Sequence, residues 1–189
     1  MGVDMSRTLL VMLAVAALAL SQVVRGQQKP TGLIGDLMTD VAEVEQKITS
    51  LATALPEKAW GWRPGAGVRS SSEVIVHVAA DNYVMPASLG IAVPPAIGID
   101  VSKFETLGAF EKRARTRQQA MSELAASFAF LKQQIAATSD AQLGTPITVF
   151  GRPSTRRATW IFAVAHLHEH LGQLIAYARS NSVVPPWSR

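Results

Sequence analysis

A run of apolar residues at alternating spacings of three and four constrains the fold of this chain more than any other feature. These residues share one stripe between positions 34 and 55: Ile34, Leu37, Val41, Val44, Ile48, Leu51 and Leu55. Such a repeat is the packing seam of an amphipathic helix in a bundle. Pro56 follows at once, and proline ends a helix because it lacks an amide hydrogen and clashes with the preceding turn. We therefore predict a helix that packs against other helices.

Three further segments have helical spacing, at about 74–85, 106–137 and 154–179. Ser70 and Glu73 form a capping-box signal before the second helix, and Ser154 or Thr155 is placed to cap the last. The segments between them are rich in glycine and proline and predict loops at 57–69, 89–102 and 138–153. No segment of useful length alternates with the period of a strand. Because 48% of residues are apolar, one domain of this length can bury a core, and we predict an all-α four-helix bundle.

The N-terminus has the layout of a secretory signal peptide. Arg7 precedes an unbroken apolar run, Leu9–Leu20, and small residues follow at usable cleavage positions. The run is too short to span a bilayer, which needs about twenty residues. We predict a signal peptide at 1–26, a linker at 27–32, the folded domain at 33–189, and a periplasmic or secreted location. An uncleaved membrane anchor is the alternative, and the only membrane contact expected is through this segment.

Charge and cysteine content exclude several kinds of function. The net charge of +4 is mild, and the basic residues are scattered apart from a stretch at 112–117, so we predict no nucleic-acid binding. That stretch is interpreted as a solvated helix face, with an anionic partner as the alternative. The absence of cysteine excludes disulfides, thiolate ligands and a cysteine nucleophile. Any transition metal must be held by nitrogen and oxygen atoms.

Three of the four histidines fall within residues 166–170 of the last predicted helix. His166 and His170 are four residues apart, so they lie on one face and can bind the same metal ion. Gln173 and Tyr177 continue that face. His168 is rotated by roughly 200° from His166 and points elsewhere. The alternative is a pair of partly buried histidines with ordinary hydrogen-bond partners.

A third ligand must come from another helix. His77 is the remaining histidine, on the apolar second helix, where it could instead be a satisfied core residue. Asp81, four residues later, can orient an imidazole or lie near a metal. If His77 meets the pair on the last helix, three imidazoles without a fourth protein ligand leave a coordination position open, as in catalytic sites. Asp81 and Glu169 are candidate general bases.

The motifs taken together resemble the DinB/YfiT superfamily of metal-binding four-helix bundles, over about 33–188. The resemblance depends on short motifs in a fixed order, namely Trp62-Arg63-Pro64, Gly67-Val68-Arg69-Ser70, Glu73 with His77, His166 and His170 with Gly172-Gln173, and Tyr177 with Arg179. The tail at 184–188 is similar to that of a secreted subgroup. The resemblance implies that His77, His166 and His170 bind one divalent metal, zinc or nickel.

The resemblance does not define the reaction. It implies a metal-dependent hydrolase, or a transferase or isomerase that uses a low-molecular-weight thiol, acting on a small-molecule substrate. The signal peptide argues against a cytoplasmic thiol. A bundle that binds a metal without turnover is the alternative, and a homodimer is compatible with the sequence. A cavity beside the metal, lined by more than aliphatic groups, would favour an enzyme.

Overall fold

The computed structural model describes residues 31–188; the predicted signal peptide and most of the predicted linker lie outside the described residues. The elements follow one another along the chain as α2 (Gly32–Ala54), α3 (Glu57–Trp60), α4 (Ser71–Ala87), η1 (Pro95–Ile97), α5 (Phe104–Lys112), α6 (Arg117–Ala136), α7 (Asp140–Leu143), β1 (Pro146–Val149), β2 (Arg152–Thr155), α8 (Arg156–Ser180) and η2 (Pro186–Ser188). Of the helices in 31–188, none is long and apolar enough to cross a membrane.

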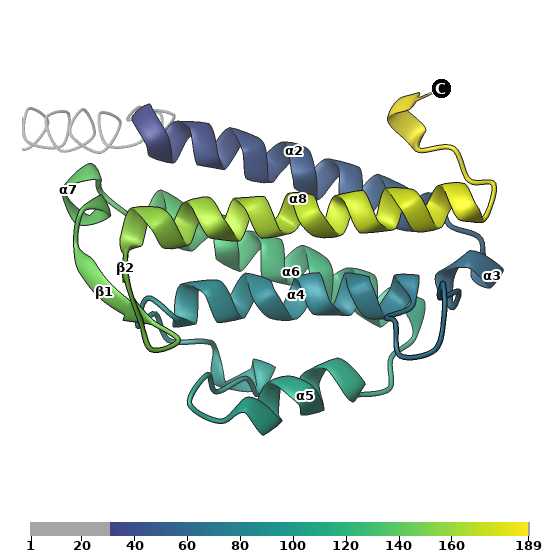
Figure 1. Ribbon diagram of the computed structural model, residues 1–189, viewed down its shortest axis with the longest axis horizontal. Coiled ribbons are helices and arrows are strands. Elements are labelled where there is room, and N and C mark those ends of the chain that lie inside the picture. Colours follow the sequence, from purple (N-terminus) through teal and green to yellow (C-terminus); the bar gives the residue numbers. More distant parts are fainter. Residues whose placement is uncertain (1–30, 189) are drawn as a thin grey trace, which may run out of the picture. The chain divides into compact units, whose positions relative to one another are not determined.

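Helices α2, α4, α6 and α8 form the predicted four-helix bundle (Figure 1). Helix α2 packs against α6 and α8, and α4 packs against the same two helices. The colours in Figure 1 show that α2 and α8 run in one direction, whereas α4 and α6 run in the other. The connection from α4 to α6 must therefore return along the length of the bundle, and α5 lies on this crossover, against α4.

The core forms along the predicted seam. Val41, Val44, Ile48 and Leu51 of α2 are completely buried, which confirms the helical spacing found in the sequence. Trp160 of α8 is also fully buried, and its indole N–H donates a hydrogen bond to Thr138 Oγ1 at 3.1 Å. Burying an indole without such a partner would cost free energy. This bond fixes the start of the α6–α8 connection, just after α6, to the core.

The predicted capping box at the start of α4 is present. The Ser70 hydroxyl accepts a hydrogen bond from the Glu73 amide, and the Glu73 carboxylate accepts one from the Ser70 amide. This reciprocal pair fixes where the helix begins, and hence which face each later residue occupies. The helix ends at Ala87, two residues beyond the predicted end, with Pro86 inside its last turn.

The prediction of one helix over 106–137 was wrong. The segment forms two helices, α5 and α6, with a break at 113–116. Thr116 caps α6 through a capping box with Gln119. Arg115 folds back and donates hydrogen bonds to the carbonyls of Phe110 and Glu111 at the end of α5. The free backbone groups at both helix ends therefore have local hydrogen-bond partners. The sequence prediction missed the break because the apolar spacing continues across it.

All three predicted loops contain short regular elements, and 89–102 contains the 3₁₀ helix η1. Helix α3 lies within 57–69, and 138–153 contains α7 and most of an antiparallel hairpin in which Val149 pairs with Arg152. The hairpin closes through Phe150 and Gly151, both at positive φ, as in a type I′ turn. These strands are four residues long, too short for alternation to be recognised.

The basic stretch at 112–117 is only partly a solvated face. Arg113 and Arg115 both form ion pairs with Glu123, and the Arg115 side chain is only 5% exposed. Arg117 donates a hydrogen bond to the carbonyl of Ala52 on α2. Most of this positive charge therefore stabilises the crossover and its junction with the bundle.

Candidate metal centre

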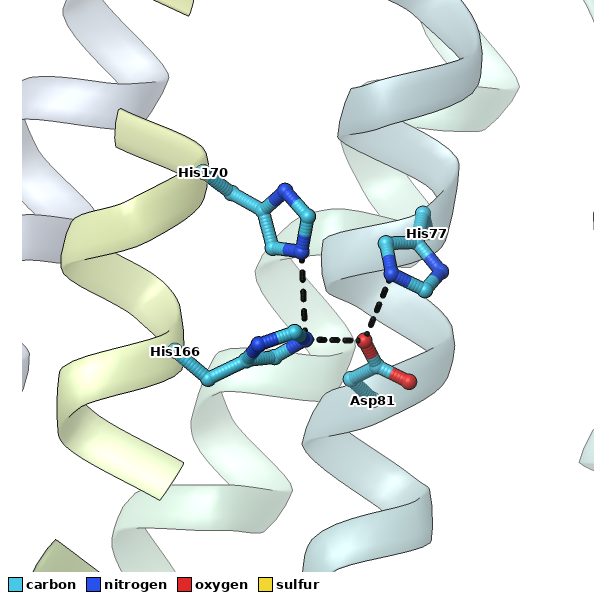
Figure 2. Close-up of side chains that lie close together, drawn as sticks. All are labelled: His77, Asp81, His166 and His170. Carbon is cyan, nitrogen blue, oxygen red and sulfur yellow. Dashed lines mark hydrogen bonds and ion pairs between the residues drawn. The ribbon is translucent and has the colours of Figure 1, made fainter. Parts of the chain in front are cut away.

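Four side chains from α4 and α8 converge between the two helices: His77, Asp81, His166 and His170 (Figure 2). His77 and Asp81 are four residues apart on α4, and His166 and His170 are four apart on α8. Each pair therefore lies on one helix face, and α4 packs against α8 so that the faces meet. One nitrogen or oxygen atom from each residue lies within 4.8 Å of the others. We call these four residues the donor cluster.

The Nε2 atoms of the three imidazoles face the Asp81 carboxylate and one another. Asp81 Oδ2 lies 3.0 Å from His77 Nε2 and 2.8 Å from His166 Nε2. His170 Nε2 lies 3.1 Å from His166 Nε2. Two ligand atoms on one tetrahedral ion, each about 2.0–2.1 Å from it, are roughly 3.3 Å apart. The observed spacings are close to that value, so the donor cluster fits a single divalent ion.

Two of the imidazoles also have a close acceptor at the opposite nitrogen. His77 Nδ1 lies 2.6 Å from Glu111 Oε1, and His170 Nδ1 lies 3.0 Å from Gln173 Oε1. Gln173 in turn donates its amide hydrogen to the Tyr177 hydroxyl, which leaves Oε1 as the acceptor toward His170. A neutral imidazole that donates through Nδ1 presents the lone pair of Nε2 to the centre of the cluster, as a metal ligand requires.

The two α8 histidines of the donor cluster have opposite electrostatic environments. The hydrogen bond to Asp81 raises the pKa of His166 above its usual value. Burial lowers the pKa of His170, because desolvation disfavours its charged form. The hydrogen bond from His77 lowers the pKa of Glu111, which therefore stays ionised. Because a metal ligand must be deprotonated, the raised pKa of His166 makes protons compete more strongly with a metal ion for its nitrogen.

The structure separates His168 from the donor cluster, as the helical periodicity predicts. His168 Nε2 lies 2.7 Å from Asp40 Oδ1 on α2, and the side chain is half exposed. Glu169 also points away: its carboxylate lies 3.5 Å from His166 Nδ1, the nitrogen on the outer side of the ring, and is 75% exposed. Glu169 is therefore placed to orient His166, whereas Asp81 alone of the two candidate bases reaches the Nε2 atoms.

Two carboxylates lie close to the three imidazoles. Asp81, expected to orient an imidazole, to lie near a metal or to act as a base, has one oxygen within 4.8 Å of a nitrogen of each ring. Glu111 was not predicted. It contacts His77 from α5, 34 positions along the chain, and Arg69 lies 3.3 Å from its other carboxylate oxygen. No local pattern indicates this contact, because it depends on how α5 docks on α4.

Aromatic residues contact His166 of the donor cluster and the Gln173–Tyr177 pair beside His170. Phe162, four residues before His166, stacks on its imidazole with ring centroids 5.8 Å apart and planes 20° from parallel. At the other end, Trp62 meets Tyr177 edge to face at 5.4 Å. Trp62, in the segment between α3 and α4, therefore packs against α8.

Comparisons with known proteins agree with this architecture. The family model of the DinB superfamily matches residues 41–174. A search of curated proteins finds no match. Among solved structures, a conserved protein from Enterococcus faecalis is similar with a TM-score of 0.64 and 17% identity, over 79% of this chain and 97% of that one. A DinB-like protein from Bacillus cereus is similar with a TM-score of 0.65 and 14% identity, over 79% and 93% of the two chains.

YfiT from Bacillus subtilis is similar with a TM-score of 0.61 and 14% identity, over 83% of this chain and 93% of that one. It is described as a probable metal-dependent hydrolase with an unusual four-helix bundle topology. At such identities the structural likeness establishes the fold alone. Since the family model spans most of the described residues, the chain belongs to the DinB superfamily.

Proposed function

We propose that this protein is an exported metal-dependent hydrolase that binds one divalent ion, zinc or nickel, through His77, His166 and His170. The convergence of three Nε2 atoms, each with an acceptor near its Nδ1 atom, is the observation that carries the proposal. When bound, such an ion supplies Lewis-acid chemistry: it polarises a carbonyl or phosphoryl oxygen and makes water more acidic. The likeness to YfiT agrees with this reaction class.

The residues of the chain have distinct roles in this proposal. The three histidines hold the ion, and Glu111, Glu169 and Gln173 orient their rings. Asp81 accepts the proton that hydrolysis releases, because its carboxylate is the one in 31–188 that reaches the inner Nε2 atoms. If Asp81 instead binds the ion as a fourth ligand, the site is closed and of the structural kind.

Access to the donor cluster favours catalysis over a purely structural role. The side chains of His77 and His166 are 14% and 18% exposed, so the cluster is not sealed. A pocket lined by aromatic and polar groups lies one helical turn away, near Phe162. Export is supported by Arg7 and the apolar run that follows it, and the secreted subgroup by the tail at 184–188.

The proposal is tested with purified protein that is loaded with zinc or nickel, or freed of metal. We expect hydrolysis of at least one class among carboxylic esters, amides and phosphodiesters, with loss of turnover on chelation and recovery on adding metal. Asp81→Ala should retain the metal and lose turnover. Loss of the metal in this variant would instead identify a closed site. The substrate screen also includes thiol transfer. Metal binding without turnover in any of these assays would favour a binding protein.

A further inference from the structure

The tip of the hairpin, the end of α4 and the first half of α8 line an open pocket of about 570 Å³. Its walls include Met85 of α4, Phe150 and Arg152 of the hairpin, and Thr159 and Phe162 of α8. Pockets of about 300–1,000 Å³ are typical of small-molecule sites. The volume is thus suited to an organic ligand and larger than a metal ion or a few waters require.

The pocket adjoins the donor cluster along both helices. Met85 follows Asp81 by four residues on α4, and Phe162 precedes His166 by four residues on α8. Residues at this spacing are neighbours on one helix face. The stacking of Phe162 on His166 makes the link direct, since the same ring lines the pocket and contacts an imidazole of the cluster. A ligand in the pocket would reach the cluster past the Phe162 ring.

The aromatic walls of the pocket are unusually exposed. Phe150 is 56% exposed and Phe162 is 54% exposed. Phe150 also has a φ of +48°, in the left-handed region that a bulky side chain rarely adopts. The first position of a two-residue type I′ turn favours asparagine, aspartate or glycine. The structure thus holds an apolar ring at a turn position unfavourable to it, over the pocket, and local strain of this kind is found at functional sites.

The charge of the pocket is positive and uncompensated. Arg152 forms no ion pair with any residue in the described part of the chain, and none of the described lining residues is acidic. The hydroxyl of Thr159 already donates to the Thr155 carbonyl. Arg152 is the cationic group of the pocket, and its planar guanidinium suits carboxylate, sulfonate or phosphate oxygens.

We propose that this pocket binds an anionic substrate that carries an aromatic or branched apolar group. The carboxylate of the substrate, or an equivalent oxyanion, contacts Arg152. The proposal rests on the proposed function, since the scissile bond would lie at the donor cluster while Phe150 and Phe162 contact the apolar group. It assigns the substrate to small amphipathic acids and argues against cationic or sugar-like compounds, which offer neither the negative charge nor the apolar surface.

The test uses metal-free protein, so that it does not depend on catalysis. Two probes of nearly the same shape, 2-naphthalenesulfonate and the neutral 2-naphthalenesulfonamide, are titrated by calorimetry. The sulfonate should bind about fivefold more tightly, the effect of one partly exposed ion pair. Arg152→Gln should remove this difference. Arg157→Gln makes the same charge change at an exposed α8 position outside the pocket, and should preserve it.

Equal affinities of the wild-type protein for the two probes would overturn the proposal. An equal effect of the two arginine variants would overturn it as well, because it would show that the net charge of the protein, and no local site, attracts the sulfonate. If the protein does not bind a metal or does not catalyse hydrolysis, these titrations of metal-free protein are unaffected. Failure of the proposed function is therefore distinguished from failure of the pocket proposal.

A second variant examines Phe150. Phe150→Asn places a favoured residue in the turn, so the melting temperature should be unchanged or higher, whereas both probes should bind more weakly. A lower melting temperature with unchanged probe affinity would show that Phe150 serves packing and would contradict its role in the pocket.

Discussion

Glu111 offers a sharp test of how the site is built. Within the donor cluster it contacts only His77, at the outer nitrogen of the ring. Its Oε1 atom lies 2.6 Å from His77 Nδ1, and its lowered pKa keeps it ionised at neutral pH. Glu111→Gln preserves the shape and one acceptor oxygen but removes the charge. Glu111→Ala removes the acceptor as well. Changes to residues of this kind weaken metal affinity by about 10–100-fold. We expect the glutamine variant near the lower value and the alanine variant near the higher one.

The affinities are measured by competition with a chromophoric chelator, after circular dichroism has shown that each variant is folded. Glu105→Gln is the matched control, since it lies on the same helix, is exposed and forms no ion pair with a described residue. Wild-type affinity in both Glu111 variants would refute the argument that this carboxylate orients His77. Equal losses in Glu111→Gln and Glu105→Gln would attribute the effect to net charge.

Three further predictions follow from the sequence and structure. Ser70→Ala should lower the free energy of unfolding by about 1 kcal/mol, because it removes one half of the capping box, and urea titration that shows no loss would contradict this. Metal affinity should fall as the pH drops through the raised pKa of His166, since protons compete for Nε2; affinity unchanged from pH 8 to 5 would argue against imidazole ligands. Mass spectrometry of the native protein should find a start near Gln22 or Gln27, and an intact Met1 in the cytoplasm would contradict export.

The parts of the structure that depend on local periodicity were predictable from the sequence. The buried seam of α2 follows from spacing alone, and so does the separation of His168 from His166 and His170. The start of α4 follows from the Ser70–Glu73 box. In each case the geometry of one helix determines which residues share a face.

Other parts depend on tertiary contacts or on weak local signals. The break between α5 and α6 was in principle visible in the capping sequence from Thr116 to Gln119, but the apolar spacing continues across it. The hairpin turn contains Phe150-Gly151, which lacks the usual asparagine or aspartate. The Glu111–His77 contact joins two helices whose relative position the crossover determines, so no sequence spacing encodes it.

The central claim is most directly tested by the metal content of His166→Ala and His168→Ala, measured by mass spectrometry after loading with zinc and gel filtration. These residues are two positions apart on α8, yet one contacts Asp81 in the donor cluster and the other contacts Asp40 on α2. We predict one tightly bound ion per chain in the wild type and in His168→Ala, and none in His166→Ala. Metal lost from His168→Ala but kept by His166→Ala would contradict the site.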